Sequence, residues 1–318
     1  MKTVSAILLS IISAVTAAQA AESGACDRAC LEGIADQYLA AMVAHDPAKA
    51  PLAEDLVFTE NLVRLPVTEG LWFTASGLGD FKFYVADVQT GQVAWTGVAK
   101  EHGKSVLLSV RLKVVDRRIT EAESIVVRDV NEERNLATLK SPPPELDEFL
   151  EPSERMSRAD MLAVIETYFE ALDTLDASKV PWDEDAYRVE NGMVTCGRIP
   201  GMAAPAAGIP VPASRACKSP DGKVPYALKT VYNVVPRRTP LIDEEKGITW
   251  GLYVFNHRGV DKIPLPDGSV VESYFKSPNS MPWADTFKTK NRKLRGIFAF
   301  GISVPYGMED GWGGSLFK

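Results

Sequence analysis

The sequence has few of the residues that build metal or nucleic-acid sites. Its 318 residues include three histidines and four cysteines, and no pair of cysteines has the C-x-x-C spacing of a zinc cluster. Acidic residues outnumber basic ones, 42 to 35, which gives a net charge of −7. Proteins that hold nucleic acid or anionic lipid by charge are usually basic. We therefore expect no metal, no nucleic-acid partner and no membrane partner.

Nucleotide-binding and serine-hydrolase motifs are also missing. The sequence contains no G-x-S-x-G elbow, and no P-loop or dinucleotide fingerprint between a strand and a helix. We therefore expect no cofactor.

Long apolar runs are confined to the N-terminus. Residues 1–20 read MKTVSAILLSIISAVTAAQA, in which Lys2 precedes a short apolar stretch and Ala18-Gln19-Ala20 matches a signal-peptidase cleavage pattern. This pattern predicts a signal peptide. An uncleaved anchor is the alternative, although the stretch is short for a bilayer. We expect the mature chain to be secreted or periplasmic, where cysteines are usually oxidised.

The four cysteines form an even set and are expected to pair. A bond between Cys196 and Cys217 would close a loop rich in Pro and Gly and stabilise the fold by about 3 kcal/mol. Cys26 and Cys30 would then form a bond at the start of a helix or in a turn. Cross-pairing between the N-terminal and the loop cysteines is the alternative. No cysteine is left over to act as a catalytic thiol.

The chain repeats itself. A shift of 130 residues places Asp27–Asn61 on Ser157–Asn191 without a gap, and both segments begin with a good N-cap residue. One apolar stripe recurs at helical spacing. Its matched positions are Leu31, Ile34, Ala35, Tyr38 and Met42 in the first copy and Met161, Val164, Ile165, Tyr168 and Leu172 in the second. Two related domains are therefore predicted.

Alternating apolar and polar residues follow the helix in each copy and predict strands. The expected strands are 81–85, 92–99, 106–114 and 119–127 in the first copy, and 226–235, 248–257, 286–289 and 294–304 in the second. By the last strands the shift has grown to 175, so the second copy holds roughly 45 extra residues. The predicted organisation is a signal peptide at 1–20, a first domain at 21–128, a Pro-rich acidic linker at 129–156, a second domain at 157–306 with a Pro/Gly-rich insertion at 192–225, and a Gly-rich tail at 307–318.

A helix, a short acidic segment and a run of antiparallel strands predict the α+β class. With the stretches HDPAKAPLAEDLVFTEN and RLKVVDRRITEAESIVV, this pattern resembles the NTF2-like (SnoaL-like, cystatin-like cone) superfamily. Stretches such as CDRACLEGIADQYLAAMVAHDP and PYGMEDGW also resemble a group of exported bacterial and fungal proteins of uncharacterised function. The resemblance implies two tandem NTF2-like units, each with helices packed on a curved antiparallel sheet around a pocket. Superfamily members include dehydratases, isomerases and cyclases, whereas others only bind or dimerise.

A pocket of that kind would transfer protons with a few titratable groups in apolar surroundings. His257 is the main candidate for this role. It shares one face of the predicted strand 248–257 with Tyr253 and Phe255, which would form an aromatic substrate-binding wall. The alternative is that His257 only caps the end of the strand.

Three further residues complete the predicted site. Tyr232 would donate its hydroxyl to a carbonyl, Asp185 would supply a carboxylate, and Arg238 would hold an anionic substrate group. Each has a structural alternative: a core tyrosine, a fold requirement shared by both copies, and an exposed strand end. The Glu190-Asn191 pair, which repeats Glu60-Asn61, is interpreted as structural.

These observations predict a secreted, cofactor-independent lyase or isomerase, dehydratase- or cyclase-like. It would act on a small hydrophobic or aromatic molecule in the second unit, with His257, Tyr232 and Asp185 as catalytic residues. One alternative is a non-catalytic small-molecule-binding or interaction protein of the same fold. Another is a structural tandem pair whose units pack sheet to sheet. The expected partner is a small-molecule ligand, and a homodimer is a further option.

Overall fold

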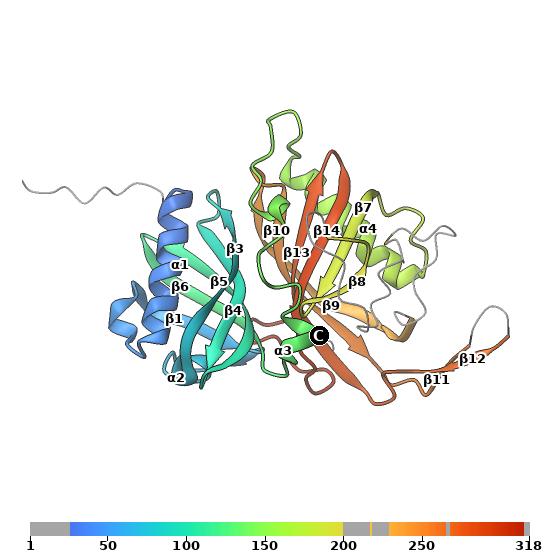
Figure 1. Ribbon diagram of the computed structural model, residues 1–318, viewed down its shortest axis with the longest axis horizontal. Coiled ribbons are helices and arrows are strands. Elements are labelled where there is room, and N and C mark those ends of the chain that lie inside the picture. The colour runs from blue at the N-terminus through green and yellow to red at the C-terminus, as the bar shows by residue number, and fades with distance from the viewer. Residues whose placement is uncertain (1–25, 200–216, 218–228, 265–267, 315–318) are drawn as a thin grey trace, which may run out of the picture.

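The chain forms two six-stranded sheets, each with one long helix against it (Figure 1). The computed structural model describes residues 26–199, 217, 229–264 and 268–314. The predicted signal peptide and most of the predicted insertion lie outside these residues. The fold is α+β, as predicted from the sequence, with two consecutive units of the same order.

The first unit has a mixed sheet in the order β2-β1-β6-β5-β4-β3, in which only β1 and β6 run parallel. Its elements are α1 (Arg28–Val43), η1 (Pro47–Lys49), β1 (Leu52–Glu60), β2 (Val63–Arg64), α2 (Leu71–Thr74), β3 (Ala75–Asp87), β4 (Gln92–Glu101), β5 (Lys104–Val115) and β6 (Arg118–Val127). Two short helices follow in the connection to the second unit, α3 (Glu132–Asn135) and η2 (Pro144–Leu146).

The second unit repeats this arrangement, with the order β8-β7-β14-β13-β10-β9 and a parallel β7–β14 pair. Its elements are α4 (Arg158–Thr174), β7 (Trp182–Glu190), β8 (Met193–Cys196), β9 (Asn233–Asp243), β10 (Ile248–His257), β13 (Asn279–Lys290) and β14 (Lys293–Gly301). A separate hairpin of β11 (Lys262–Pro264) and β12 (Val270–Glu272) projects from the body (Figure 1). Within the described residues, no helix is both long and apolar enough to span a membrane.

The repeat seen in the sequence extends to capping and strand register. The Asp27 carboxylate accepts from the Cys30 N–H, and the Ser157 hydroxyl accepts from the Asp160 N–H, so both long helices begin at the predicted caps. All ten stripe residues of the two helices are buried. Strand partners repeat as well: β1 pairs with β6 as β7 pairs with β14, with offsets of 130 and 175 residues.

Asn61 and Asn191 make the same turn in the two units. Both have a positive φ, 52° and 46°, a conformation that asparagine tolerates better than most residues. The Asn61 side chain bonds the backbone N–H and C=O of Val126, and the Asn191 side chain bonds those of Gly301. These asparagines therefore hold the last strand of each sheet against the first.

The predicted strand 226–235 is placed wrongly, because β9 begins at Asn233 and continues to Asp243. Pro236 and Pro240 lie within β9, and a proline removes one backbone N–H. However, β9 lies at the edge of its sheet, where a missing N–H costs no ladder hydrogen bond.

The outer faces of the two sheets pack against each other through one apolar cluster. Phe81 and Phe83 of the first unit lie with their ring centroids 5.5 and 5.4 Å from that of Phe298 in the second. The Trp250 indole donates to the Ser109 hydroxyl across the same contact (2.9 Å). The two units thus pack sheet to sheet, which is the arrangement that the structural alternative for the tandem pair predicted.

Two ion pairs cross this contact in opposite directions. Arg158 at the start of α4 pairs with Asp87 at the end of β3 (2.7 Å), and Asp87 also accepts from the Ile242 N–H (2.9 Å). Arg28 at the start of α1 pairs with Asp243 at the end of β9 (2.8 Å), which accepts from the Ala86 N–H (3.3 Å). The arginines are equivalent in the repeat, so the units are related by an approximate two-fold.

We expect Arg158→Met to lower the free energy of unfolding by about 3 kcal/mol, because it leaves the buried Asp87 carboxylate without a cation. Arg292→Met is the matched control. It breaks the ion pair with Asp160 at an arginine that is 75% exposed, so its cost should be at most about 1 kcal/mol. Urea denaturation at neutral pH measures both. Equal losses in the two variants would contradict the importance of the crossed pairs.

Candidate acid–base site

His257 lies at the end of β10 and is buried. Its Nδ1–H donates to the Thr230 carbonyl (3.0 Å), and its ring stacks on Phe275 at 3.9 Å. Burial lowers the pKa of His257, so its neutral form is favoured. These contacts join the strand end to the base of the β11–β12 hairpin. They match the capping alternative considered for this residue.

Tyr253 and Phe255 face the helix side of the sheet, where both contact Phe169 of α4. The ring centroids lie 4.5 and 6.4 Å apart, respectively. The Tyr253 hydroxyl shares a hydrogen bond with Thr239 Oγ1 (2.7 Å). The two aromatic residues predicted to bind substrate are therefore part of the packed core of the second unit.

The other predicted site residues do not converge with each other. Tyr232 precedes β9 rather than lying within it, is 45% exposed, and carries Arg258 over its ring. The Asp185 side chain is 77% exposed and bonds Arg295. Of these residues, only Tyr232 lies beside His257, because its N–H donates to the Asn256 carbonyl (2.7 Å).

Arg238 was predicted to hold an anionic substrate group, with an exposed strand end as the alternative, and the structure places it inside β9. It pairs with Glu123 of the first unit and with Asp310 near the C-terminus. Both carboxylates are buried. The Arg238 guanidinium is thus engaged at the contact between the units.

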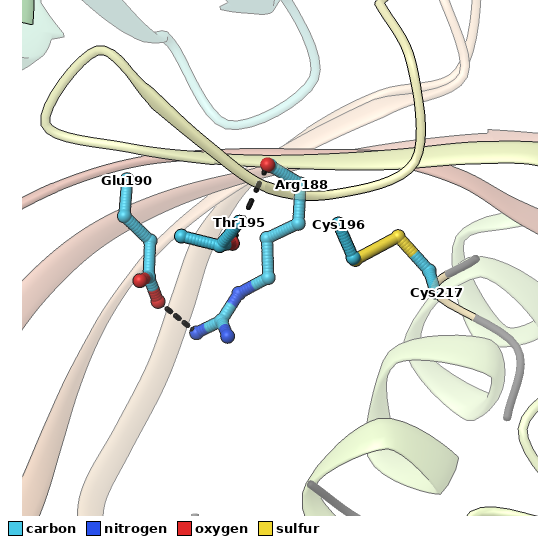
Figure 2. Close-up of a disulfide and its surroundings, with 5 residues drawn as sticks. All are labelled: Arg188, Glu190, Thr195, Cys196 and Cys217. Atoms are coloured by element: carbon cyan, nitrogen blue, oxygen red, sulfur yellow. Dashed lines mark hydrogen bonds and ion pairs between the residues drawn. A yellow bond between two sulfur atoms is a disulfide. The ribbon is translucent and has the colours of Figure 1, made fainter. Parts of the chain in front are cut away.

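A different set of charged residues meets inside the second unit. Arg188 and Glu190 alternate on β7 and form an ion pair (Figure 2). Asp285 on β13 is 3% exposed. Glu190 and Asp285 flank Ala299 of β14 from opposite sides, so all three share one row of the sheet. The Arg188 guanidinium carbon lies 5.8 Å from the Tyr168 ring of α4, which places the cluster on the helix side of the sheet.

The electrostatics favour one neutral acid beside one ion pair. Burial raises the pKa of Asp285 to about 7, an effect that Arg188 opposes and Glu190 reinforces. Burial works against the charge of Arg188, but Glu190, Tyr168 and Asp285 raise its pKa above the ordinary value. Asp285 can therefore hold a proton near neutral pH while Arg188 remains a cation.

Three buried donors in this region lack a hydrogen-bond partner among the described residues: the Tyr168 hydroxyl, Arg188 Nε and Trp182 Nε1. Tyr168 and Trp182 lie edge-on to each other with ring centroids 6.0 Å apart. Burial also raises the pKa of Tyr168, so this hydroxyl keeps its proton. Buried donors are normally paired, so the cluster is suited to meet an acceptor atom.

The first unit keeps the glutamate, as Glu60, but has no charge at the positions that match Arg188 and Asp285. By the offsets of 130 and 175 residues, Phe58 is the first-unit equivalent of Arg188, and Val110 is the first-unit equivalent of Asp285. The two apolar residues line a cavity of about 10 Å³ together with Tyr38, Glu60 and Trp72. A charged residue at a position that is apolar in the other copy was the available signal for Arg188 and Asp285, and our sequence analysis missed it.

Both disulfides are present and pair as the first alternative predicted. Cys26–Cys30 lies at the start of α1, and Cys196–Cys217 joins β8 to a residue 21 positions further on. Cys196 pairs with Arg188 in the β7–β8 ladder, and its disulfide lies beside the Arg188–Glu190 pair (Figure 2). Cys217 packs against the core of the second unit. The bond therefore borders the charged cluster.

The family match covers the second unit. Residues 154–301 match a family described as a domain of unknown function (DUF8021), a segment that contains the whole charged cluster. No curated protein sequence matches the chain. Among solved structures, AclR, a proposed hydroxylase from Streptomyces galilaeus, is 18% identical with a TM-score of 0.27. The match covers 32% of this chain and 82% of AclR.

We expect Asp285→Asn to change how the free energy of unfolding varies with pH. The carboxyl has a pKa of about 7 in the fold, against an ordinary 3.8. Between these values it is protonated when folded and ionised when unfolded. Wild-type stability relative to the variant should therefore fall as the pH rises from about 4 to about 7 and then level off. The total loss should be about 4 kcal/mol.

Urea denaturation between pH 4 and 8 measures this difference. Asp285→Val, which restores the residue type of the first unit, should remove the same pH dependence. A wild-type minus variant difference that does not change with pH would show that Asp285 is not held protonated.

Proposed function

We propose that the second unit is a cofactor-independent acid–base catalyst of the lyase or isomerase type, which acts on a small hydrophobic or aromatic molecule. One observation carries this proposal: a buried carboxyl, Asp285, whose pKa is raised to about 7, lies in one row with the ion-paired Glu190. Titratable groups whose pKa values are moved toward neutrality by burial are typical of proton-transfer sites.

The cluster offers one group for each part of a proton transfer. In an elimination, the Glu190 carboxylate takes a proton from carbon, and the electron pair of that C–H bond forms the new double bond. Asp285 gives its proton to the leaving hydroxyl, which departs as water. Tyr168 donates a hydrogen bond to a substrate oxygen, and Arg188 holds Glu190 in place. In an isomerisation, the proton returns to a different carbon instead.

This proposal moves catalysis away from His257, Tyr232 and Asp185. The His257 ring is engaged by Phe275 and Thr230, and Asp185 is exposed and paired. Tyr168, Arg188 and Asp285 instead share an interior position. The first unit, with Phe58 and Val110 at the matching positions, would serve as the structural partner of the second.

We also propose an NTF2-like fold for each unit and export of the protein. The helix against a curved mixed sheet and the cluster between them support the fold (Figure 1). The two disulfides and the signal-peptide pattern support secretion.

An interaction protein remains the second candidate, because one observation favours it. The β11–β12 hairpin projects from the body (Figure 1), and it presents exposed apolar side chains at Val270 (56%) and, just beyond it, Tyr274 (89%). Exposed aromatic residues of this kind are typical of contact surfaces.

Turnover in deuterated buffer tests the catalytic proposal. The mature protein is incubated in ²H₂O with small-molecule extracts, and untargeted mass spectrometry records compounds that are consumed or labelled. Asp285→Asn and Glu190→Gln should each lower the initial rate at least about 100-fold, whereas His257→Ala should keep most of it. Full turnover by Asp285→Asn would refute the assignment. Wild-type protein that labels and consumes nothing would favour the interaction role.

A further inference from the structure

The β11–β12 hairpin forms a small sheet of its own that projects from the body (Figure 1). A two-stranded hairpin is at best marginally stable in water. Apolar side chains are nevertheless exposed on β12 and just beyond it, at Val270 (56%), Val271 (39%) and Tyr274 (89%). The ladder of the hairpin joins three residue pairs, Lys262–Glu272, Ile263–Val271 and Pro264–Val270. A short sheet with this surface points to a contact with another chain.

The ladder leaves the outer edge of β12 open. The Ser273 N–H donates to the Asp261 carbonyl (2.9 Å), and hydrogen-bonded and non-hydrogen-bonded pairs alternate along an antiparallel ladder. The next hydrogen-bonded pair is therefore Ile263–Val271. The backbone N–H and C=O groups of Val270 and Glu272 point away from β11, and within the described residues they have no partner in another strand.

The two edges of the hairpin are protected differently. On β11 the outward positions hold Lys262 and Pro264, and a lysine and a proline are two features that keep an edge strand from pairing. On β12 the outward positions hold Glu272 and Val270, which both keep their N–H groups. The charge of Glu272 is offset by an ion pair with Lys276. The edge of β12 is therefore the one that can accept a further strand.

A second copy of this chain fits that edge. In an antiparallel pair with a two-fold axis at Val271, Val270 lies opposite Glu272 of the second copy, and Glu272 lies opposite its Val270. These backbone groups point outward in both copies, so each pair can exchange its two hydrogen bonds. The two glutamates do not face each other, so no like charges meet directly. A two-fold pairing of this kind closes as a dimer.

The same register continues an apolar row. Ile263 and Val271 lie opposite each other on one face of the hairpin. Ile263 is buried, whereas Val271 is exposed at the open edge. In the two-fold arrangement the two Val271 residues form a non-hydrogen-bonded pair, in which side chains approach most closely. The row then crosses four strands, and an apolar face over three or more strands is what a small sheet needs for stability.

We infer that the protein forms a symmetric homodimer in which β12 pairs with β12 of a second copy, antiparallel and centred on Val271. This inference goes beyond the proposed function and does not depend on it. The hairpin is small, and small contacts give weak or transient association. We therefore expect a dissociation constant on the order of 0.1 mM.

Sedimentation velocity of the full mature protein from about 10 µM to about 1 mM, a range that spans the expected dissociation constant, tests the inference. The average mass should rise from that of the monomer toward that of the dimer. A chain that stays monomeric throughout would overturn the inference and leave the β12 edge to a strand of a different protein. Growth beyond the dimer would also overturn it, because the two-fold pairing is closed.

Substitution at the two-fold axis tests the register. Val271→Lys and Val271→Glu each place two like charges face to face, so each should weaken association at least about 10-fold. An equimolar mixture of the two variants pairs lysine with glutamate and should restore association. Val115→Lys is the matched control, at a 46% exposed valine that ends β5 in the first unit, and should dimerise like wild type. A mixture that associates no better than its components would overturn the register.

A second pair of variants tests the backbone contact. Glu272→Pro removes an outward N–H and leaves the β11–β12 ladder intact, so it should weaken association, whereas Glu272→Gln keeps the N–H and should dimerise like wild type. Equal association of these two variants would rule out strand pairing at this edge. Thermal unfolding of each variant establishes that it is folded.

Discussion

The crossed pairs Arg28–Asp243 and Arg158–Asp87 are the constraint on which the rest of the structure depends. Each arginine begins the long helix of one unit and reaches a buried carboxylate at the last residue of an edge strand in the other. Each carboxylate also accepts a hydrogen bond from a backbone N–H in the edge strand of the other unit: Asp243 from Ala86 and Asp87 from Ile242. Because direction and partners are specific, these bonds fix the alignment of two sheets that apolar packing alone would hold without a unique register.

That alignment determines which faces of the sheets remain for chemistry. The outer faces are buried in the contact between the units, where Phe81, Phe298 and Trp250 pack. Only the helix sides are left as enclosed interiors. In the first unit this interior is closed by Trp72. In the second it holds Arg188 and Asp285, so the same scaffold carries a filled interior and a charged one.

The sequence allowed prediction of features that repeat and not of those that differ. Matching N-caps and helical stripes identified α1 and α4, because local capping and periodicity determine helices. The predicted strand 226–235 ended at the residue before Pro236, whereas β9 continues through Pro236 and Pro240, which an edge strand tolerates. Asp285 was missed because the predicted strand 286–289 began one residue after it, whereas β13 runs from Asn279 to Lys290. Its burial depends on α4 and β7, which are distant in sequence.

The duplication within one chain has an evolutionary consequence. In a symmetric homodimer, a substitution in the interior alters both sites at once, so a costly buried charge is incurred twice. Here the positions that hold Phe58 and Val110 in the first unit hold Arg188 and Asp285 in the second. The buried charges therefore affect only one half of the chain. Because the two units belong to one chain, the second can carry destabilising buried charges while the matching positions of the first stay apolar.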